Sequence, residues 1–340
     1  MSMFRVGVSR DFLDAEGTNV WGDIGLARLD EEGIPWEYLP ETVAAFSPAD
    51  LEPYDAVIFA APAVTADSFA EGVRRPRLLA RFGVGYDTVD LEACTHAGVA
   101  VTITPDGARR PVALAALSLV LAVQHNLVVK DRLVREGRWP DRVNWMGHRV
   151  TGATIGLIGL GNTGGELVRL LQPLGASVLA HDPHCPAERA SGLGVELVDL
   201  PTLALRADVV VVMCALTPET FHLVDAAFLA LMKPDSALVN VARGPIVDEH
   251  ALIAALESGT IRAAGLDVFE EEPQTSGIER LTNVTLAPHS LAWTAEMSRG
   301  NGESCVQAVL DMASGRIPQF VVNRAVFEEP MFTTRLEPAS

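Results

Sequence analysis

The sequence predicts an α/β protein with two doubly wound parallel-sheet domains, and two observations support this prediction. Short apolar or β-branched runs alternate with helical or loop segments over residues 4–104, and a second alternation begins near Arg109. Repeated strand–helix units of this kind form right-handed, mostly parallel sheets. The second observation is a Gly-x-Gly-x-x-Gly turn at Gly159–Gly164, which follows an apolar strand and opens a helix. That order is typical of a Rossmann fold.

The expected strands are short apolar runs, and their ends mark where a ligand should bind. The first alternation contains Phe4–Val8, Trp36–Leu39, Ala56–Ala60, Leu78–Phe82 and Val99–Ile103. The second contains Thr154–Ile158, Ser177–Ala180, Val209–Met213, Leu238–Val241, Ala264–Val268 and Val284–Ala287. Ligands of open α/β sheets bind at the carboxyl ends of the strands. The residues at these ends are therefore expected to face one crevice, and they are Cys214, Arg243, Asp267 and His289.

The glycine-rich turn has the chemistry of a dinucleotide site. Gly159 permits the tight turn, Gly161 lets the backbone approach a pyrophosphate, and Gly164 allows the helix to pack closely on the strand. Apolar side chains then recur at helical spacing, at Leu167, Leu170, Leu171 and Leu174. The alternative is a glycine turn that only saves space in an α/β unit, and the downstream pattern makes it the weaker interpretation.

Asp182 predicts the cofactor. It ends the next strand, close to the roughly 20-residue spacing after the glycines that is expected of a ribose-binding acid. A carboxylate accepts hydrogen bonds from the ribose hydroxyls and repels a 2′-phosphate. Pro183 and His184 follow where an NADP site usually has an arginine, and Arg189 is the nearest cation that could soften the preference. The sequence therefore predicts NAD.

Composition limits the possible partners. The chain has 340 residues and a net charge of −18, which argues against nucleic acid or an anionic membrane as a partner. The four cysteines show neither Cys-x-x-Cys nor zinc spacing, so we expect no metal and a reducing, cytoplasmic location. The N-terminus lacks the layout of a signal peptide.

An uncharged run from Pro111 to Val129 is long enough to span a thin bilayer, but Gln124, His125 and Asn126 interrupt it. We interpret the run as a helix buried between domains or between subunits, which favours a homodimer.

Three groups could supply chemistry next to a bound NAD. His289 follows a strand end, and histidine is the side chain best suited to give or take a proton near neutral pH. The alternative is a structural histidine. Arg243 could hold a carboxylate in a bidentate manner, or it could only cap its loop. Glu270–Glu272 would ordinarily be a solvated acidic turn, but a carboxylate beside an imidazole would fix its tautomer, so one of these acids is kept as a candidate.

Four segments give the chain a resemblance to the D-isomer-specific 2-hydroxyacid dehydrogenases over roughly residues 50–325. They are Arg81–Asp90, Gly159–Gly164, Asn240–Glu249 and the stretch from Gly265–Pro273 to Ala287–His289. The resemblance implies that Arg243 binds the substrate carboxylate and carbonyl, that His289 is the general acid/base, and that Glu272 is its partner. It also implies that Val84 and Gly85 offer backbone N–H groups to the substrate carboxylate. The implied NAD contacts are Gly159, Gly161, Asn162, Thr163, Gly164, Asp182, Val241, Ala242 and Asp267.

The same resemblance implies a discontinuous topology. Residues 1–107 and 297–330 would form a flavodoxin-like substrate-binding domain, residues 108–296 an inserted Rossmann NAD domain, and residues 331–340 a tail. The chain departs from the family pattern at Leu114, where an acid is common, at Met213, where a histidine is common, and at Trp293, which could narrow the pocket.

The sequence thus predicts an NAD-dependent oxidoreductase that interconverts a small 2-oxoacid and a D-2-hydroxyacid, acting as a reductase. The alternative is an NAD-sensing corepressor or scaffold protein of the same fold, which would bind the dinucleotide and turn over slowly on every oxoacid. A formate-type dehydrogenase is less well supported, because formate oxidation removes no proton from the substrate and needs no His289–Glu272 pair.

Overall fold

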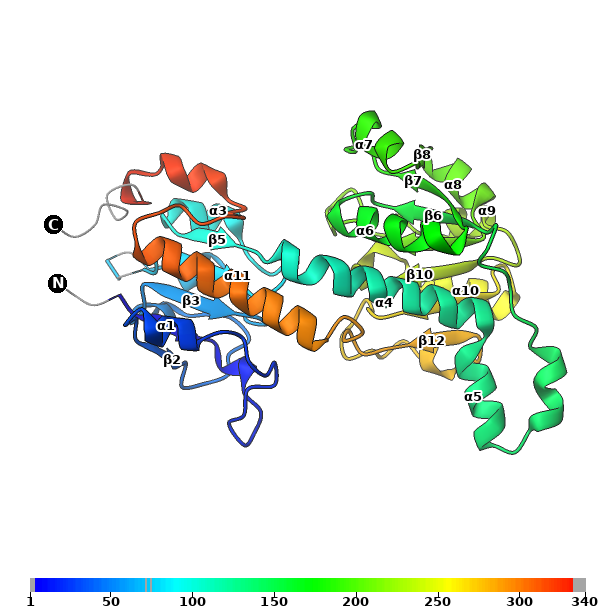
Figure 1. The fold of residues 1–340 in the computed structure, drawn as a ribbon, viewed down its shortest axis with the longest axis horizontal. Helices are drawn as coiled ribbons and strands as arrows, with labels where there is room; N and C mark the ends of the chain where they lie inside the picture. Colours follow the sequence, from blue (N-terminus) through cyan, green and yellow to red (C-terminus); the bar gives the residue numbers. More distant parts are fainter. Residues whose placement is uncertain (1–3, 71, 74, 333–340) are drawn as a thin grey trace. The chain divides into compact units, whose positions relative to one another are not determined.

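The structure is a computed structural model that describes residues 4–70, 72–73 and 75–332. The chain divides into two compact units, Met1–Ala108 with Trp293–Ser340, and Arg109–Ala292 (Figure 1). The resemblance predicts these divisions after residues 107 and 296. The predicted tail lies outside the described residues from residue 333 onward, but Phe332 is buried in the core of the first unit.

The first unit is a parallel sheet in the order β2-β1-β3-β4-β5. This strand order is that of flavodoxin-like folds, as predicted. The strands are β1 (Val6–Val8), β2 (Trp36–Tyr38), β3 (Ala56–Phe59), β4 (Leu78–Arg81) and β5 (Ala100–Thr102). The helices of this unit are α1 (Ala27–Glu31), α2 (Pro48–Leu51), α3 (Leu91–His96) and α11 (Ala295–Ala313). Apolar side chains from both faces of the sheet are buried, and α11 covers one face with Cys305, Val306 and Val309.

The second unit is a parallel sheet in the order β12-β11-β10-β9-β6-β7-β8. Chain order reverses between β6 and β9, so this unit is a Rossmann fold with its switch point beside the glycine-rich turn. The strands are β6 (Thr154–Ile158), β7 (Ser177–His181), β8 (Glu196–Leu197), β9 (Val209–Val212), β10 (Ala237–Asn240), β11 (Ala263–Leu266) and β12 (Val284–Leu286). The helices are α5 (Leu127–Arg135), α6 (Asn162–Leu171), α7 (Ala187–Gly192), α8 (Leu200–Arg206), α9 (Ala226–Leu231) and α10 (Glu249–Ser258).

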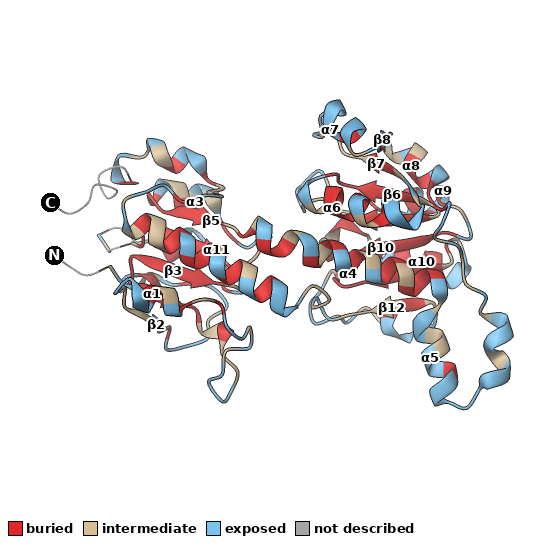
Figure 2. Ribbon diagram, viewed as in Figure 1, coloured by how far each residue is buried: buried red, intermediate tan, exposed pale blue. Residues whose placement is uncertain are grey.

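Helix α4 (Pro105–His125) contains most of the uncharged run, and the chain passes from the first unit to the second within it. Ala113, Ala116, Leu119 and Val123 share a buried cluster with strand residues of the second unit. Figure 2 shows buried positions along α4. The buried residues of the run within α4 are therefore explained by packing within the chain, whereas Leu127, in the same run but on α5, is exposed. Within the described residues no single helix meets the length and hydropathy required to cross a membrane, whereas α4 and α5 taken together, bent by 61°, do meet them.

The predicted strands are all present, but several are a residue or two shorter than predicted. The two residues of β8 were not predicted, because a run this short has no recognisable periodicity.

Candidate active site

The glycine-rich turn forms a cradle that only glycine can make. Gly159 has φ of +100°, and a Cβ there would lie 2.7 Å from the backbone nitrogen of Cys214. A Cβ on Gly164 would lie 2.6 Å from the carbonyl oxygen of Gly159, whereas one on Gly161 would meet nothing within 4 Å. The turn is thus closed toward β9 and open at Gly161, where α6 begins. An open turn at a helix N-terminus fits a dinucleotide pyrophosphate.

Asp182 lies at the end of β7, and its carboxylate is fixed by the backbone. Leu160 N–H donates to Oδ2 at 2.7 Å, and His184 N–H donates to Oδ1 at 3.0 Å. Arg189 donates to the carbonyl oxygen of Leu160 at 3.3 Å, so a cation lies beside the same turn.

Cys214, which the sequence also places at a strand end, lies across the switch point. Burial raises the pKa of the Cys214 thiol to about 11, so this cysteine remains a neutral thiol.

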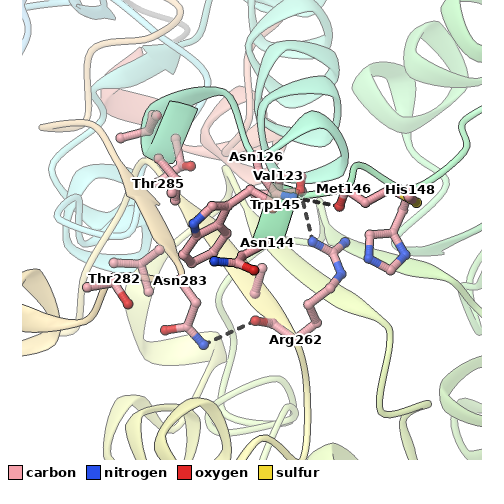
Figure 3. A pocket seen from close by; sticks show the side chains of 14 residues that line it. Val123, Asn126, Asn144, Trp145, Met146, His148, Arg262, Thr282, Asn283 and Thr285 are labelled. Carbon is pink, nitrogen blue, oxygen red and sulfur yellow. Dashed lines mark hydrogen bonds between the residues drawn. The ribbon is translucent and has the colours of Figure 1, made fainter. Parts of the chain in front are cut away.

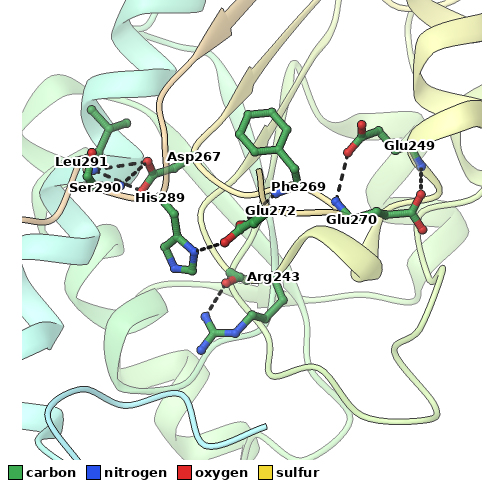
Figure 4. A network of polar contacts seen from close by, with 10 residues as sticks. Arg243, Glu249, Asp267, Phe269, Glu270, Glu272, His289, Ser290 and Leu291 are labelled. Carbon is green, nitrogen blue, oxygen red and sulfur yellow. Dashed lines mark hydrogen bonds and ion pairs between the residues drawn. The ribbon is translucent and has the colours of Figure 1, made fainter. Parts of the chain in front are cut away.

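His289 and Glu272 form the ion pair that the resemblance predicts. The imidazole Nδ1 lies 2.8 Å from Glu272 Oε2, and Phe269 N–H donates to the other carboxylate oxygen at 3.2 Å (Figure 4). Glu272 is therefore held on both oxygens, and it fixes the ring through Nδ1. Nε2 has no partner among the described residues, so it is the ring nitrogen that can exchange a proton with a substrate.

Asp267 holds the turn that carries His289. Its buried carboxylate accepts hydrogen bonds from Ser290 N–H at 2.9 Å and Leu291 N–H at 3.2 Å. Burial raises the pKa of Asp267, and these two N–H donors oppose that shift. The structure thus gives Asp267 a role in shaping the turn after His289, and its predicted contact with NAD stays a prediction, as do those of Asn162, Thr163, Val241 and Ala242.

Arg243 lies in the loop after β10, and Asn240 shapes that loop. The Asn240 side chain donates to the Arg243 carbonyl oxygen at 2.9 Å and accepts from Ala242 N–H at 3.0 Å. The guanidinium of Arg243 donates to the Ala242 carbonyl oxygen at 2.7 Å, and in Figure 4 it lies on the same side of these loops as the His289 imidazole. Sequence analysis missed Asn240. Asn240 could have been recognised as a polar residue at the end of an apolar strand. A buried amide at such a position must form hydrogen bonds, and here it binds the loop that follows.

The predicted carboxylate-binding loop belongs to the first unit and is held there from two sides. Gly83 N–H donates to the Thr104 hydroxyl at 2.9 Å, and Arg81 donates to the carbonyl oxygens of Phe82 at 3.0 Å and Gly85 at 3.1 Å. The side chain of Val84 remains exposed. This loop is well anchored, and the part of Val84 and Gly85 in substrate binding stays a prediction.

A separate pocket of about 210 Å³ lies in the second unit near the start of β11 and β12, and its lining contains none of the predicted site residues. Figure 3 shows Trp145 and Arg262 among its side chains. Arg262 donates to the Gln124 side chain at 2.6 Å and to the Val123 carbonyl oxygen at 3.0 Å, and Asn283 donates to the Arg262 carbonyl oxygen at 3.1 Å. These polar groups bind one another, so the pocket gives no sign of a particular ligand.

A dinucleotide cradle and a carboxylate-bound histidine at the carboxyl edge of one Rossmann sheet define a dinucleotide-dependent oxidoreductase. The sequence profile described as "D-isomer specific 2-hydroxyacid dehydrogenase, NAD binding domain" matches residues 117–290. The chain belongs to the D-isomer specific 2-hydroxyacid dehydrogenase family, and its second unit contains that family's NAD-binding domain.

Known relatives agree with this assignment. The glyoxylate reductase of Pyrococcus horikoshii is 35% identical over 91% of this chain and 90% of its own length. The D-3-phosphoglycerate dehydrogenase of Methanocaldococcus jannaschii is 38% identical over 74% of this chain, which spans only 48% of that protein. The crystal structure of an NADPH-dependent glyoxylate/hydroxypyruvate reductase from Sinorhizobium meliloti, bound to NADP and malonate, superimposes with a TM-score of 0.78 at 29% identity, covering 95% of this chain and 98% of that chain. These relatives are enzymes by name, and they give no support to the corepressor alternative.

Proposed function

We propose that the protein is an NADH-dependent reductase that converts a small 2-oxoacid to the D-2-hydroxyacid. The observation that carries this proposal is the 2.8 Å contact between His289 Nδ1 and Glu272. It supplies a proton source at the sheet edge that also carries the dinucleotide cradle. The reduction direction needs a general acid, and an imidazole held by a carboxylate is suited to that role.

The chain's own residues would do the remaining chemistry. When bound, NADH would supply a hydride to the carbonyl carbon. His289, as an imidazolium whose charge Glu272 balances, would donate the proton on Nε2 to the carbonyl oxygen. Arg243 binds the substrate carboxylate and stabilises the negative charge that develops on the oxygen. Val84 and Gly85 are proposed to offer backbone N–H groups to the same carboxylate.

Asp182 supports a preference for NADH over NADPH. Its Oδ2 is held by Leu160 N–H of the glycine-rich turn and its Oδ1 by His184 N–H, and a 2′-phosphate beside this carboxylate would be repelled. The S. meliloti reductase is NADPH-dependent by name, so the preference proposed for this chain rests on Asp182 and not on that relative.

We propose glyoxylate and hydroxypyruvate as the first substrates to test, because the chain spans 90% of the P. horikoshii glyoxylate reductase. The experiment follows NADH absorbance with glyoxylate, hydroxypyruvate, pyruvate and bulkier 2-oxoacids, and repeats each assay with NADPH. We expect turnover with at least one small 2-oxoacid and a clear preference for NADH. Tight NADH binding without oxidation by any oxoacid would reject the proposed function.

We also propose a cytoplasmic homodimer. All four cysteines are free thiols, which is consistent with a reducing compartment. Large apolar side chains are exposed on α5 and the segment that follows it, at Leu127, Val134, Trp139, Val143 and Met146. Exposed apolar groups of this kind favour burial against a second copy of the chain. Light scattering on the purified protein tests this, and a monomer at micromolar concentration would reject it.

A further inference from the structure

We propose that His222 is a positioning residue that straps the Arg243 turn to the loop carrying Glu272. This inference depends on the proposed function in one respect, which is that Arg243 binds the substrate. His222 lies in the loop between β9 and α9, and it does not follow directly on a strand. In the structure it contacts two loops that carry predicted catalytic groups.

The contacts of His222 involve both its side chain and its backbone. Its imidazole Nε2 forms an ion pair with Glu270 Oε1, and its backbone N–H donates to the Pro245 carbonyl oxygen at 2.9 Å. The residue has φ of +51°, which a non-glycine residue adopts only where its surroundings require it. One residue thus reaches the turn after Arg243 and the loop before Glu272.

Glu270 is itself held firmly, so it is a fixed anchor for the strap. Glu249 N–H, in the first turn of α10, donates to Glu270 Oε2 at 3.3 Å, and Glu270 N–H donates to the Glu249 carboxylate at 3.1 Å (Figure 4). This reciprocal pair places the Glu270 carboxylate at a helix N-terminus, where a negative charge is favoured.

The two loops joined by His222 are in direct backbone contact. A Cβ on Gly244 would lie 1.8 Å from the backbone of Phe269, so the Arg243 turn rests on the Phe269–Glu270 backbone. The segment after His222 continues along the same turn. Val224 N–H donates to the Ile246 carbonyl oxygen at 3.0 Å, and Asp248 N–H donates to the Val224 carbonyl oxygen at 3.0 Å.

The strap should act on substrate binding more than on proton transfer. The His222 backbone binds the turn that orients the Arg243 guanidinium, and the hydrogen bonds and ion pairs of the described residues include none between His222 and the His289–Glu272 pair. Loss of the imidazole would remove the contact between this segment and Glu270 and loosen the Arg243 turn. We therefore expect KM for the 2-oxoacid to change more than kcat.

The experiment compares His222→Ala, His222→Gln and the matched control His250→Ala, whose side chain is exposed on α10. We expect KM of His222→Ala to rise by about tenfold, the value of one hydrogen bond to a charged group, with kcat within about threefold of wild type. Glutamine can still donate to Glu270, so His222→Gln should recover most of the KM. His250→Ala should behave as wild type.

A second readout does not depend on turnover. Hydrogen–deuterium exchange, followed by mass spectrometry of peptides covering residues 243–248, should be faster in His222→Ala and unchanged in His250→Ala. Wild-type KM and exchange in His222→Ala, or equal damage in the alanine and glutamine variants, would overturn the proposal. If His222→Ala does not fold, Glu270→Gln weakens the same contact and tests it by the same readouts. Failure of the wild-type protein to reduce any oxoacid would reject the proposed function, and the exchange comparison would still test the strap.

Discussion

The second unit contains two histidine–glutamate pairs that look alike and have different surroundings. His289 and His222 both have φ of +51°, and both bind an acid of the run Glu270–Glu272. The side chains of His289 and Glu272 are 46% and 40% exposed, whereas those of His222 and Glu270 are 34% and 26% exposed. His289 uses Nδ1 for its glutamate, which leaves Nε2 at the tip of the ring for a substrate. His222 uses Nε2, so its tip is already occupied.

The ring nitrogen that binds the glutamate determines whether each histidine can also exchange a proton with a substrate. A histidine bound through Nδ1 keeps a proton donor pointing outward, and a histidine bound through Nε2 becomes a link between loops. Phe221 stacks on the His222 ring with centroids 4.0 Å apart, which covers one face of that pair. The His289–Glu272 pair is therefore suited to proton transfer, and the His222–Glu270 pair is suited to holding two loops together.

Among substitutions in the two histidine–glutamate pairs, His289→Ala should have the largest effect. Loss of the general acid should lower kcat by a factor of about 10² to 10⁴, far more than any substitution in the other pair. Steady-state kinetics with NADH and the best 2-oxoacid measures this, and circular dichroism confirms that the variant is folded. Unchanged turnover would remove the assignment of His289 as the acid.

Glu272→Gln should have the next largest effect. The amide is neutral, so it no longer balances an imidazolium, and we expect kcat to fall by about tenfold to a hundredfold. KM should change less than kcat, which is the opposite of the pattern expected for the His222 strap. Equal changes in KM for Glu272→Gln and His222→Ala would mean that the two pairs are not distinct.

Glu270→Gln should affect the kinetics less than Glu272→Gln does. This difference would show that the neighbouring acids of one run have different roles. Glutamine keeps an acceptor for Glu249 N–H but loses the charge that pairs with His222. We expect KM to rise by roughly threefold with kcat near wild type, since only the charge-assisted part of the bond is lost. A fall in kcat as large as that of Glu272→Gln would contradict the separation.

Phe221→Ala should have the smallest effect. The ring is largely exposed but stacks on His222, so its loss should destabilise the protein by about 0.5–1.5 kcal/mol. Thermal denaturation measures this, and KM should change by less than about twofold, because the His222–Glu270 contact itself remains. A larger rise in KM would show that the stack, and not the ion pair, holds the loop.

The sequence could predict much of this site because its main residues follow strands. His289, Arg243 and Asp182 each come shortly after an apolar run, and parallel strands bring their carboxyl ends to one edge. The resemblance then chose Glu272 from the acidic run, which composition alone would have treated as a solvated turn. In the structure, Glu272 is the member of that run that binds His289.

The supporting residues could not be predicted in the same way. His222 and Glu270 lie 48 residues apart in loops, where no periodicity reports which side chains meet. Asn240 and Asp267 act through backbone N–H and carbonyl groups of irregular turns, and their partners depend on loop geometry that only the folded chain fixes. The uncharged run is predicted to be buried between domains or between subunits, whereas its buried residues in α4 pack on the sheet of the second unit.

The fixed carboxylate of Asp182 has a consequence for anyone who wishes to redesign the coenzyme choice of this protein. Under the proposed function, replacing Asp182 by a small or basic residue would make room for a 2′-phosphate. The same change would leave the backbone N–H groups of Leu160 and His184 without their acceptor. Each amide left unbonded costs about 1–3 kcal/mol if water does not reach it. A change of coenzyme preference therefore requires a redesign of the whole loop after β7 together with Asp182, for example with Arg189 in a new position. Substitution of Asp182 alone would disturb the glycine-rich turn that binds the nucleotide.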